Sequence, residues 1–157
     1  MLDTPIGPLQ CGVNEPGEVV FINFVAGRGA KDLPGAVADP RRLQRLTIQL
    51  REFFDGSRTE FDLPLSPRGT EFQKQVWSVL RRIPFGSTRS YQEIATTIGR
   101  PAATRAVGAA NGSNPIPIVV PCHRVIGSNG SLTGFGGGLP VKRWLLEHEA
   151  GIARLRF

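Results

Sequence analysis

The sequence predicts two domains, an α/β domain over residues 1–66 and a mostly α domain over residues 67–157. Three observations support this division. Strand-like and helix-like apolar patterns both occur before residue 66, and the pattern becomes helical after residue 69. Between them, Ser66-Pro67-Arg68-Gly69 has the composition of a linker. A chain of 157 residues fits one domain, or two small ones that share an interface.

Strands are expected at both ends of the first domain. Ile6 to Val13 and Val19 to Val25 are predicted strands, and Asn14-Glu15-Pro16-Gly17 between them suits a tight turn. Phe61 to Leu65 is a candidate third strand. Pro64 restricts it to a short or edge strand because proline has no N–H to donate.

One helix is expected between these strands. Residues 27–38 are Gly-rich and without a period, which predicts a loop. Asp39 followed by Pro40 is typical of a helix start. The apolar residues that follow recur at helical spacing until Gly56: Leu43, Leu46, Leu50, Phe53 and Phe54.

Three helices are predicted in the first part of the second domain. Thr70-Glu71-Phe72-Gln73 and Ser90-Tyr91-Gln92-Glu93 each fit a capping box. The first helix has an apolar stripe of Phe72, Val76, Val79, Leu80 and Ile83. The second runs to Ile98, and after Gly99-Arg100-Pro101 a third covers Ala102 to Asn111. Two short helices joined by a Gly-containing turn are typical of a helix-turn-helix.

Charge is distributed unevenly between the two domains. Residues 1–67 contain seven basic and nine acidic side chains, a balance of −2, whereas residues 68–157 contain twelve and four, a balance of +8. A basic surface confined to the second domain favours a polyanionic partner, nucleic acid above all. An Arg-rich composition is the alternative explanation, but it does not account for the asymmetry.

Composition excludes several classes of protein. Two cysteines are too few for a disulfide scaffold, and two Cys with two His make a zinc cage unexpected. No apolar run reaches the roughly 18 residues of a membrane span, and the first residues lack a signal-peptide layout. We therefore expect a cytoplasmic protein without a membrane partner. Cys11, inside a predicted strand, is interpreted as a small buried apolar residue.

The third helix of the second domain consists mostly of small residues. Ala102, Ala103, Ala106, Gly108, Ala109 and Ala110 surround one long basic side chain, Arg105. Such a helix can bring its backbone close to another body, and the charge balance suggests a DNA groove. Close packing on the rest of the fold is the alternative.

A proline-rich apolar segment, residues 114–126, ends in a Cys-His pair. Prolines at three positions predict a rigid extended passage. The Cys122 thiolate would be a nucleophile, and His123 could accept the thiol proton. Neighbouring side chains of an extended pair point to opposite sides, so a water relay or a sharp turn at Cys122 is expected. A buried, inert cysteine beside a structural histidine remains the alternative.

The last predicted helix, Val141 to Ala150 after Pro140, has a carboxylate on its apolar face. Lys142, Leu145, Leu146 and Glu149 share one face at helical spacing. Glu149 is therefore either the orienting acid for His123 or a solvated carboxylate near the helix end. His148 is interpreted as a core or surface histidine.

These motifs together resemble one protein family. Pro121-Cys122-His123-Arg124-Val125 matches the active-site signature of the O6-alkylguanine-DNA alkyltransferases. Further motifs follow in the family's order: Phe85-Gly86-x-x-x-Ser90-Tyr91-Gln92, Arg105-Ala106-Val107-Gly108, Asn114-Pro115 and Leu145-Leu146-Glu147-His148-Glu149. The close resemblance covers residues 69–151, and Thr4 to Leu9 resembles the family's N-terminal domain more loosely.

The resemblance implies a role for each matched residue of the site. Cys122 is the acceptor nucleophile, His123 its base through a bound water, and Glu149 the carboxylate that orients His123. Asn114 holds the turn that bears the cysteine, and Tyr91 gives a proton to the departing guanine. Arg105 fills the gap left by a flipped nucleotide, on a DNA-binding helix that includes Ala106 and Gly108. The base pocket is lined by Val125, Phe135, Gly136 and Lys142. Phe135 stands where some relatives have Tyr, so no hydroxyl is required there.

The implied activity is direct-reversal DNA repair. The alkyl group of O6-alkylguanine in duplex DNA would pass irreversibly to Cys122 after nucleotide flipping, in one turnover, by a monomer bound in the minor groove. No metal or cofactor is implied, and O4-alkylthymine is left open as a second substrate. The implied fold is a ribonuclease H-like N-terminal domain and a winged-helix-like C-terminal domain. The alternatives are a non-catalytic alkylguanine-DNA-binding protein and a cysteine hydrolase.

Overall fold

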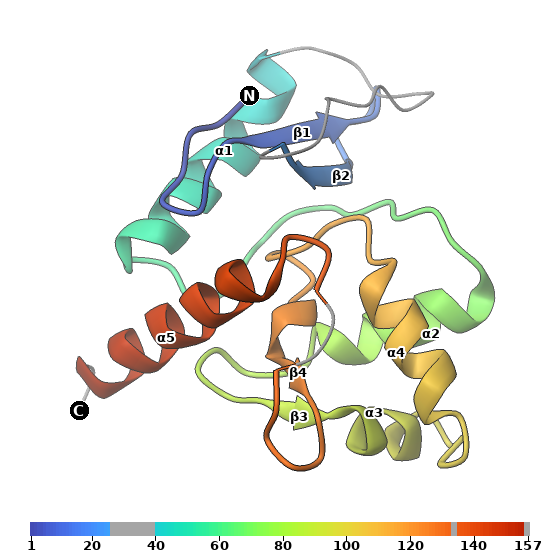
Figure 1. Cartoon of the computed structure of the whole chain (residues 1–157). Coiled ribbons are helices and arrows are strands. Elements are labelled where there is room, and N and C mark those ends of the chain that lie inside the picture. The colour runs from blue at the N-terminus through green and yellow to red at the C-terminus, as the bar shows by residue number, and fades with distance from the viewer. Residues whose placement is uncertain (26–39, 133–134, 156–157) are drawn as a thin grey trace. The chain divides into compact units, whose positions relative to one another are not determined.

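A computed structural model describes residues 1–25, 40–132 and 135–155 of the chain (Figure 1). The chain divides into two compact units, Met1–Arg68 and Gly69–Phe157. This division lies two residues after the boundary expected from the sequence. Each unit has its own apolar core.

The first unit contains an antiparallel hairpin of β1 (Leu9–Val13) and β2 (Val19–Phe24). Both predicted strands are confirmed, although β1 begins three residues later than expected. The chain before it turns at Gly7, where φ is 100° and the N–H donates to the carbonyl of Thr4 at 3.0 Å. A glycine is needed at this position because other residues rarely adopt a positive φ.

Helix α1 (Pro40–Asp55) packs on β1 and confirms the predicted helix. It ends before Gly56, whose φ of 88° is the left-handed conformation common after a helix. Three residues of the predicted stripe are fully buried: Leu46, Leu50 and Phe53. Asp39 and the loop predicted over residues 27–38 lie outside the described residues.

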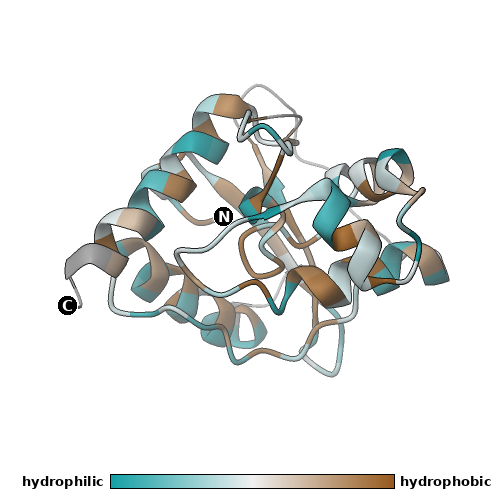
Figure 2. Cartoon of the chain, turned by 90° about the horizontal axis from the view of Figure 1, so that it is seen from below, coloured by the Kyte–Doolittle hydropathy of each residue, from teal (hydrophilic) through white to brown (hydrophobic). Residues whose placement is uncertain are grey.

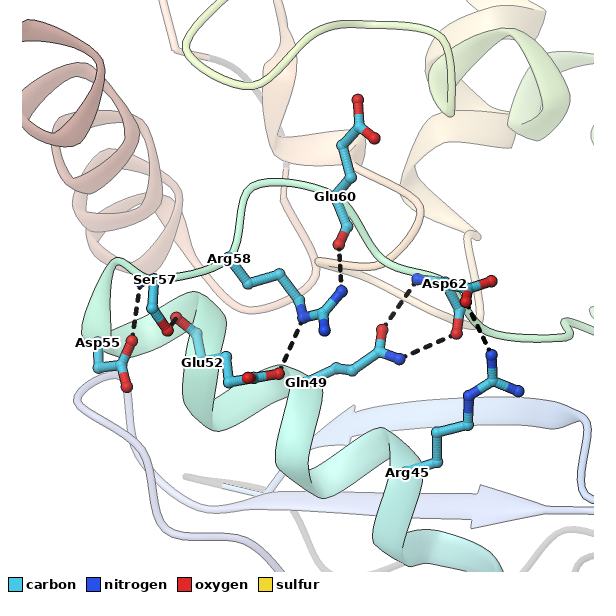
Figure 3. A network of polar contacts seen from close by, with 8 residues as sticks. All are labelled: Arg45, Gln49, Glu52, Asp55, Ser57, Arg58, Glu60 and Asp62. Carbon is cyan, nitrogen blue, oxygen red and sulfur yellow. Dashed lines mark hydrogen bonds and ion pairs between the residues drawn. The ribbon is translucent and has the colours of Figure 1, made fainter. Parts of the chain in front are cut away.

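The third strand predicted over Phe61 to Leu65 is wrong. Only Leu65 forms a bridge, to Val19. The Gln49 carboxamide of α1 occupies the backbone of Asp62, donating to its carbonyl and accepting from its N–H, both at 2.9 Å (Figure 3). Since Pro64 has no N–H, few backbone groups of this segment remain for a ladder.

The second unit is mainly helical. Its helices are α2 (Glu71–Leu80), α3 (Tyr91–Thr97), α4 (Thr104–Gly112) and α5 (Leu139–Leu155). A two-residue parallel ladder joins β3 (Arg89–Ser90) to β4 (Val125–Ile126). Both predicted capping boxes are present, at Thr70 and at Ser90, with each side chain accepting from the N–H three residues later.

Helices α3 and α4 pack against each other, and the turn predicted from the sequence connects them. α4 begins at Thr104, two residues later than expected, and α5 is longer than its predicted range at both ends. The Gln92 side chain braces the turn, donating to the carbonyl of Pro101 and accepting from the Thr104 hydroxyl, both at 2.9 Å. The short helices are thereby held in a fixed relation.

The core of the second unit lies under α2, α4 and the segment that follows α4. Trp77 of α2 is buried, and its indole N–H donates to the carbonyl of Ala110 at 2.7 Å. Figure 2 shows hydrophilic and hydrophobic residues alternating along the helices, as expected of amphipathic helices with one buried face. Within the described residues, no helix is both long enough and apolar enough to cross a bilayer.

Candidate active site

The segment that leads to Cys122 is built from tight turns. Around Ile118 the Val119 N–H donates to the carbonyl of Pro117 at 2.9 Å. This i to i+2 hydrogen bond, with a φ of 75° at Ile118, defines a γ-turn of the rare, strained kind. Ile118 is buried, so the surrounding core holds a conformation that a β-branched residue rarely adopts.

A second turn delivers Cys122 itself. The Cys122 N–H donates to the carbonyl of Val120 at 2.8 Å, around Pro121 with φ −80° and ψ 66°, an inverse γ-turn. Cys122–Arg124 then form one turn of 3₁₀-helix, η1. The expected extended passage is therefore wrong at these residues. The structure instead has a sharp turn at Cys122, one of the two alternatives expected from the sequence, because Cys122–Arg124 adopt helical geometry.

Two asparagine side chains hold this segment in place. Asn114 donates to the carbonyl of Val120 at 2.8 Å and accepts from the N–H of Ile116 at 3.0 Å. Asn111, buried in α4, donates to the carbonyl of Cys122 at 3.3 Å. No pattern in the sequence singles out Asn111 as a residue of the site. Its only local signal is an amide on the buried side of a helix, one position after Ala110.

Glu149 of α5 accepts four hydrogen bonds while being only 1% exposed. Its Oε2 accepts from His123 Nε2 at 2.6 Å and from Arg124 Nη2 at 2.9 Å. Its Oε1 accepts from Arg124 Nε at 2.8 Å and from the backbone N–H of Gly86 at 3.2 Å. A carboxylate offers about four lone-pair positions, so this buried group is fully satisfied.

The protonation states of this cluster follow from its contacts. Burial raises the pKa of Glu149, but the hydrogen bonds and charges of His123 and Arg124 outweigh burial and bring it to about 2. Glu149 is therefore a carboxylate at neutral pH, and His123 Nε2 must carry the hydrogen between them. Burial lowers the pKa of His123, which favours the neutral ring with a lone pair on Nδ1. That buried Nδ1 has no hydrogen-bond partner among the described residues.

Cys122 is 4% exposed and protonated at rest. Burial raises the pKa of its thiol to about 11, against the opposing effects of the Asn114 side chain and the Lys142 charge. Only a small fraction is thiolate at neutral pH, so an efficient nucleophile here needs a base. The neighbouring imidazole is a candidate for that base.

Comparison with known proteins shows the family to which the chain belongs. Residues 71–151 match the model of the 6-O-methylguanine DNA methyltransferase, DNA binding domain. The chain belongs to the 6-O-methylguanine DNA methyltransferase family. A methylated-DNA–protein-cysteine methyltransferase of Methanosarcina acetivorans is 47% identical over 150 residues, which span 95% of this chain and 96% of the relative. The protein of the same name from Mycolicibacterium paratuberculosis is 49% identical over 148 residues, 94% and 89% of the two chains. The OGT of Mycobacterium tuberculosis, solved in complex with DNA, superposes with a TM-score of 0.88 at 47% identity, covering 96% of this chain and 91% of its own.

A buried lysine of this family member lies beside η1. Lys142 is fully buried, donates from Nζ to the carbonyl of Val125 at 2.5 Å, and lies 5.9 Å from the centre of the Tyr91 ring. Burial lowers its pKa, while the proximity of Cys122 opposes that change. The structure therefore brings Lys142 close to three further residues that the family resemblance places around the reaction: Tyr91, Cys122 and Val125.

The remaining expected residues lie on α4 and before α5. Arg105 and Ala106 are exposed on α4, whereas Gly108 faces the Tyr91 ring, where an added Cβ would lie 3.9 Å from the ring atoms. Phe135 is half-buried and Gly136 exposed. His148 stacks on Trp144 with ring centres 4.8 Å apart, as suits a half-buried histidine. Within the described ranges, no group of three or more His, Cys, Asp or Glu side chains could hold a metal ion.

Proposed function

We propose that this chain transfers an alkyl group from O6 of guanine in duplex DNA to Sγ of Cys122, and that each molecule reacts once. The observation that carries the proposal is the 2.6 Å hydrogen bond between the ionised Glu149 and His123, which follows Cys122 with its buried thiol in the chain. The names of the close relatives, methylated-DNA–protein-cysteine methyltransferases, support it.

The proton of the thiol leaves first. Glu149 accepts from His123 Nε2, so the lone pair of Nδ1 takes the Cys122 proton, through one water. The resulting imidazolium is stabilised by the carboxylate, as in other nucleophile–base–acid arrangements. In this proposal the His123–Glu149 pair supplies the base that a thiol protonated at rest requires.

The alkyl transfer itself is a direct displacement. The thiolate attacks the alkyl carbon, an S–C bond forms, the C–O6 bond breaks with its electron pair on guanine, and the guanine ring takes up a proton with Tyr91 as the proposed donor. Val125, Phe135, Gly136 and Lys142 are the proposed lining of the base pocket. The thioether is a poor leaving group and offers no carbonyl for water to attack, so the protein is not regenerated.

Duplex DNA is the proposed partner, bound from the minor groove. The alkylated O6 lies inside the base stack, so the nucleotide must be flipped out, at roughly a few kcal/mol. Exposed Arg105 on α4 is the proposed side chain that fills the gap, with Ala106 and Gly108 allowing close approach. Basic residues outnumber acidic ones by eight in residues 68–157, which supports phosphate contacts.

The test is the mass of the protein after mixing with an O6-methylguanine duplex. We expect one added methyl on the peptide containing Cys122, none in Cys122→Ser, and the wild-type result in Cys11→Ser, a matched control in β1. Binding without a gain in mass would favour the non-catalytic alternative. Methyl released to solution over many turnovers would favour the hydrolase. The same assay with O4-methylthymine decides the second substrate.

We further propose that the protein is a monomer in the cytoplasm. We also propose that its first domain is ribonuclease H-like and its second domain winged-helix-like. The hairpin with α1 supports the first fold description, and α2 to α4 with the β3–β4 ladder support the second. Size-exclusion chromatography with and without DNA tests the monomer.

A further inference from the structure

Arg124 is a buried cation that the mechanism above leaves without a role. It is 6% exposed, and its guanidinium donates through three nitrogens. Nε and Nη2 form a fork on the two oxygens of Glu149, and Nη1 donates to the carbonyl of Ile83 at 2.7 Å. Its centre lies 5.7 Å from that of the Phe85 ring. A guanidinium with this many fixed contacts has one orientation only.

The charges of the cluster explain why a cation is needed there. A buried carboxylate with a neutral imidazole carries a net charge of −1, which is costly to bury without a partner. Such a pair reduces its charge by binding a proton. If His123 binds it, no lone pair remains for the thiol proton. If Glu149 binds it, the carboxylate that orients Nε2 is lost.

We propose that Arg124 is a positioning residue for alkyl transfer, whose charge keeps the His123–Glu149 pair from binding a proton and so preserves His123 Nδ1 as the acceptor for Cys122. This rests on the function proposed above. The bidentate geometry and the burial of all three side chains carry the inference. The lowered pKa of His123, to which the Arg124 charge contributes, agrees with it.

Within the described residues, the titratable and charged groups near His123 come from two elements. From η1 these are Cys122 and Arg124, and from α5 they are Lys142 and Glu149. Helix α2 also packs on η1, and its buried residues are Val76, Trp77 and Leu80, none of which titrates. The Lys142 charge lowers the pKa of His123 in the same direction as Arg124, and its Nζ donates to the carbonyl of Val125, whereas Arg124 forms the fork on Glu149.

A matched pair of variants separates charge from shape. Arg124→Gln and Arg124→Lys both lose the fork on Glu149, but only the lysine keeps the positive charge. Imidazole NMR of the full chain, which has two histidines, follows the protonation of His123 without any need for activity. Arg143→Met is the control, because it also removes one positive charge but at an exposed residue of α5.

We expect the midpoint at which the His123–Glu149 pair binds its proton to rise by roughly one to three pH units in Arg124→Gln. In Arg124→Lys it should rise by less than half as much, and in Arg143→Met it should not move. The rate of alkyl transfer on the acid side should fall about tenfold for each pH unit of that rise. Equal midpoints in the glutamine and lysine variants would overturn the proposal, because a purely structural role affects both alike.

The wild-type protein provides a test that needs no variant. At pH 7 its His123 should be the neutral tautomer with hydrogen on Nε2, and a charged ring or hydrogen on Nδ1 would overturn the proposal. Failure of the proposed function is distinct from this, since it appears as wild-type protein that gains no methyl while the NMR result still holds.

Discussion

Acid should destabilise the second unit through one identifiable side chain, Glu149. Its pKa is depressed from an ordinary 4.5 to about 2 in the folded protein. A depressed carboxyl pKa contributes stability that is complete above about pH 4.5 and disappears as the pH falls through about 2. At about 1.4 kcal/mol per pH unit the full contribution is about 3 kcal/mol, of which about 2 kcal/mol is lost by pH 3.

Glu149→Gln removes this titration while keeping a side chain of the same size. The assay is urea unfolding at pH 6 and pH 3, followed by the fluorescence of Trp77 and Trp144, the chain's two tryptophans, both in the second unit. The free energy of unfolding of the wild type relative to the variant should fall by about 2 kcal/mol between the two pH values. Glu147→Gln, exposed on the same helix, should follow the wild type. An equal difference at pH 6 and pH 3 would refute the reasoning.

Four further predictions concern binding, the reaction and packing. Arg105→Ala should slow repair of duplex DNA far more than reaction with free O6-alkylguanine, because only the duplex requires flipping; equal losses on both substrates would contradict the assignment. In a filter-binding series, the logarithm of the affinity for duplex DNA should fall linearly with the logarithm of the salt concentration. An affinity that does not change with salt would exclude the basic second unit as the DNA-binding surface. His123→Ala should slow methyl transfer roughly 10²- to 10⁴-fold at pH 7, and the defect should shrink as the pH rises toward the pKa of Cys122, about 11. Trp77→Phe should lower the free energy of unfolding by about 0.5–1.5 kcal/mol, since it removes the indole hydrogen bond and leaves the Ala110 carbonyl with the Ser113 hydroxyl as its side-chain donor; a calorimetric change near zero would contradict this.

The elements that the sequence predicts well are those with local causes. The capping boxes at Thr70 and Ser90 and the positive φ of Gly56 act within three or four residues, so their outcome is visible in the sequence alone. The failed strand over residues 61–65 has a distant cause. Gln49, 13 residues from Asp62, takes the backbone groups that a strand would use, and nothing near Asp62 in the sequence indicates this.

The site divides in the same way. Glu149 could be placed near His123 because it shares a helix face with two leucines, and the structure puts the two side chains in contact. Arg124 and Asn111 were missed because their partners are backbone carbonyls or shared carboxylate oxygens, which no residue pattern in the sequence indicates. The Ile83 carbonyl is 41 residues from Arg124, and the Cys122 carbonyl is 11 residues from Asn111. The chemical roles of these residues remain predictions.

The γ-turn at Ile118 limits how the reactive segment can be reused. A β-branched residue in the left-handed region costs roughly 1–3 kcal/mol, which a short free peptide has no core to offset. If residues 114–126 are isolated as a peptide or grafted into another loop, Ile118 should leave its positive φ. The segment should then lose the turns that position Cys122. We therefore expect that the reactive cysteine can be transferred to another protein only together with the apolar core that holds the turn at Ile118.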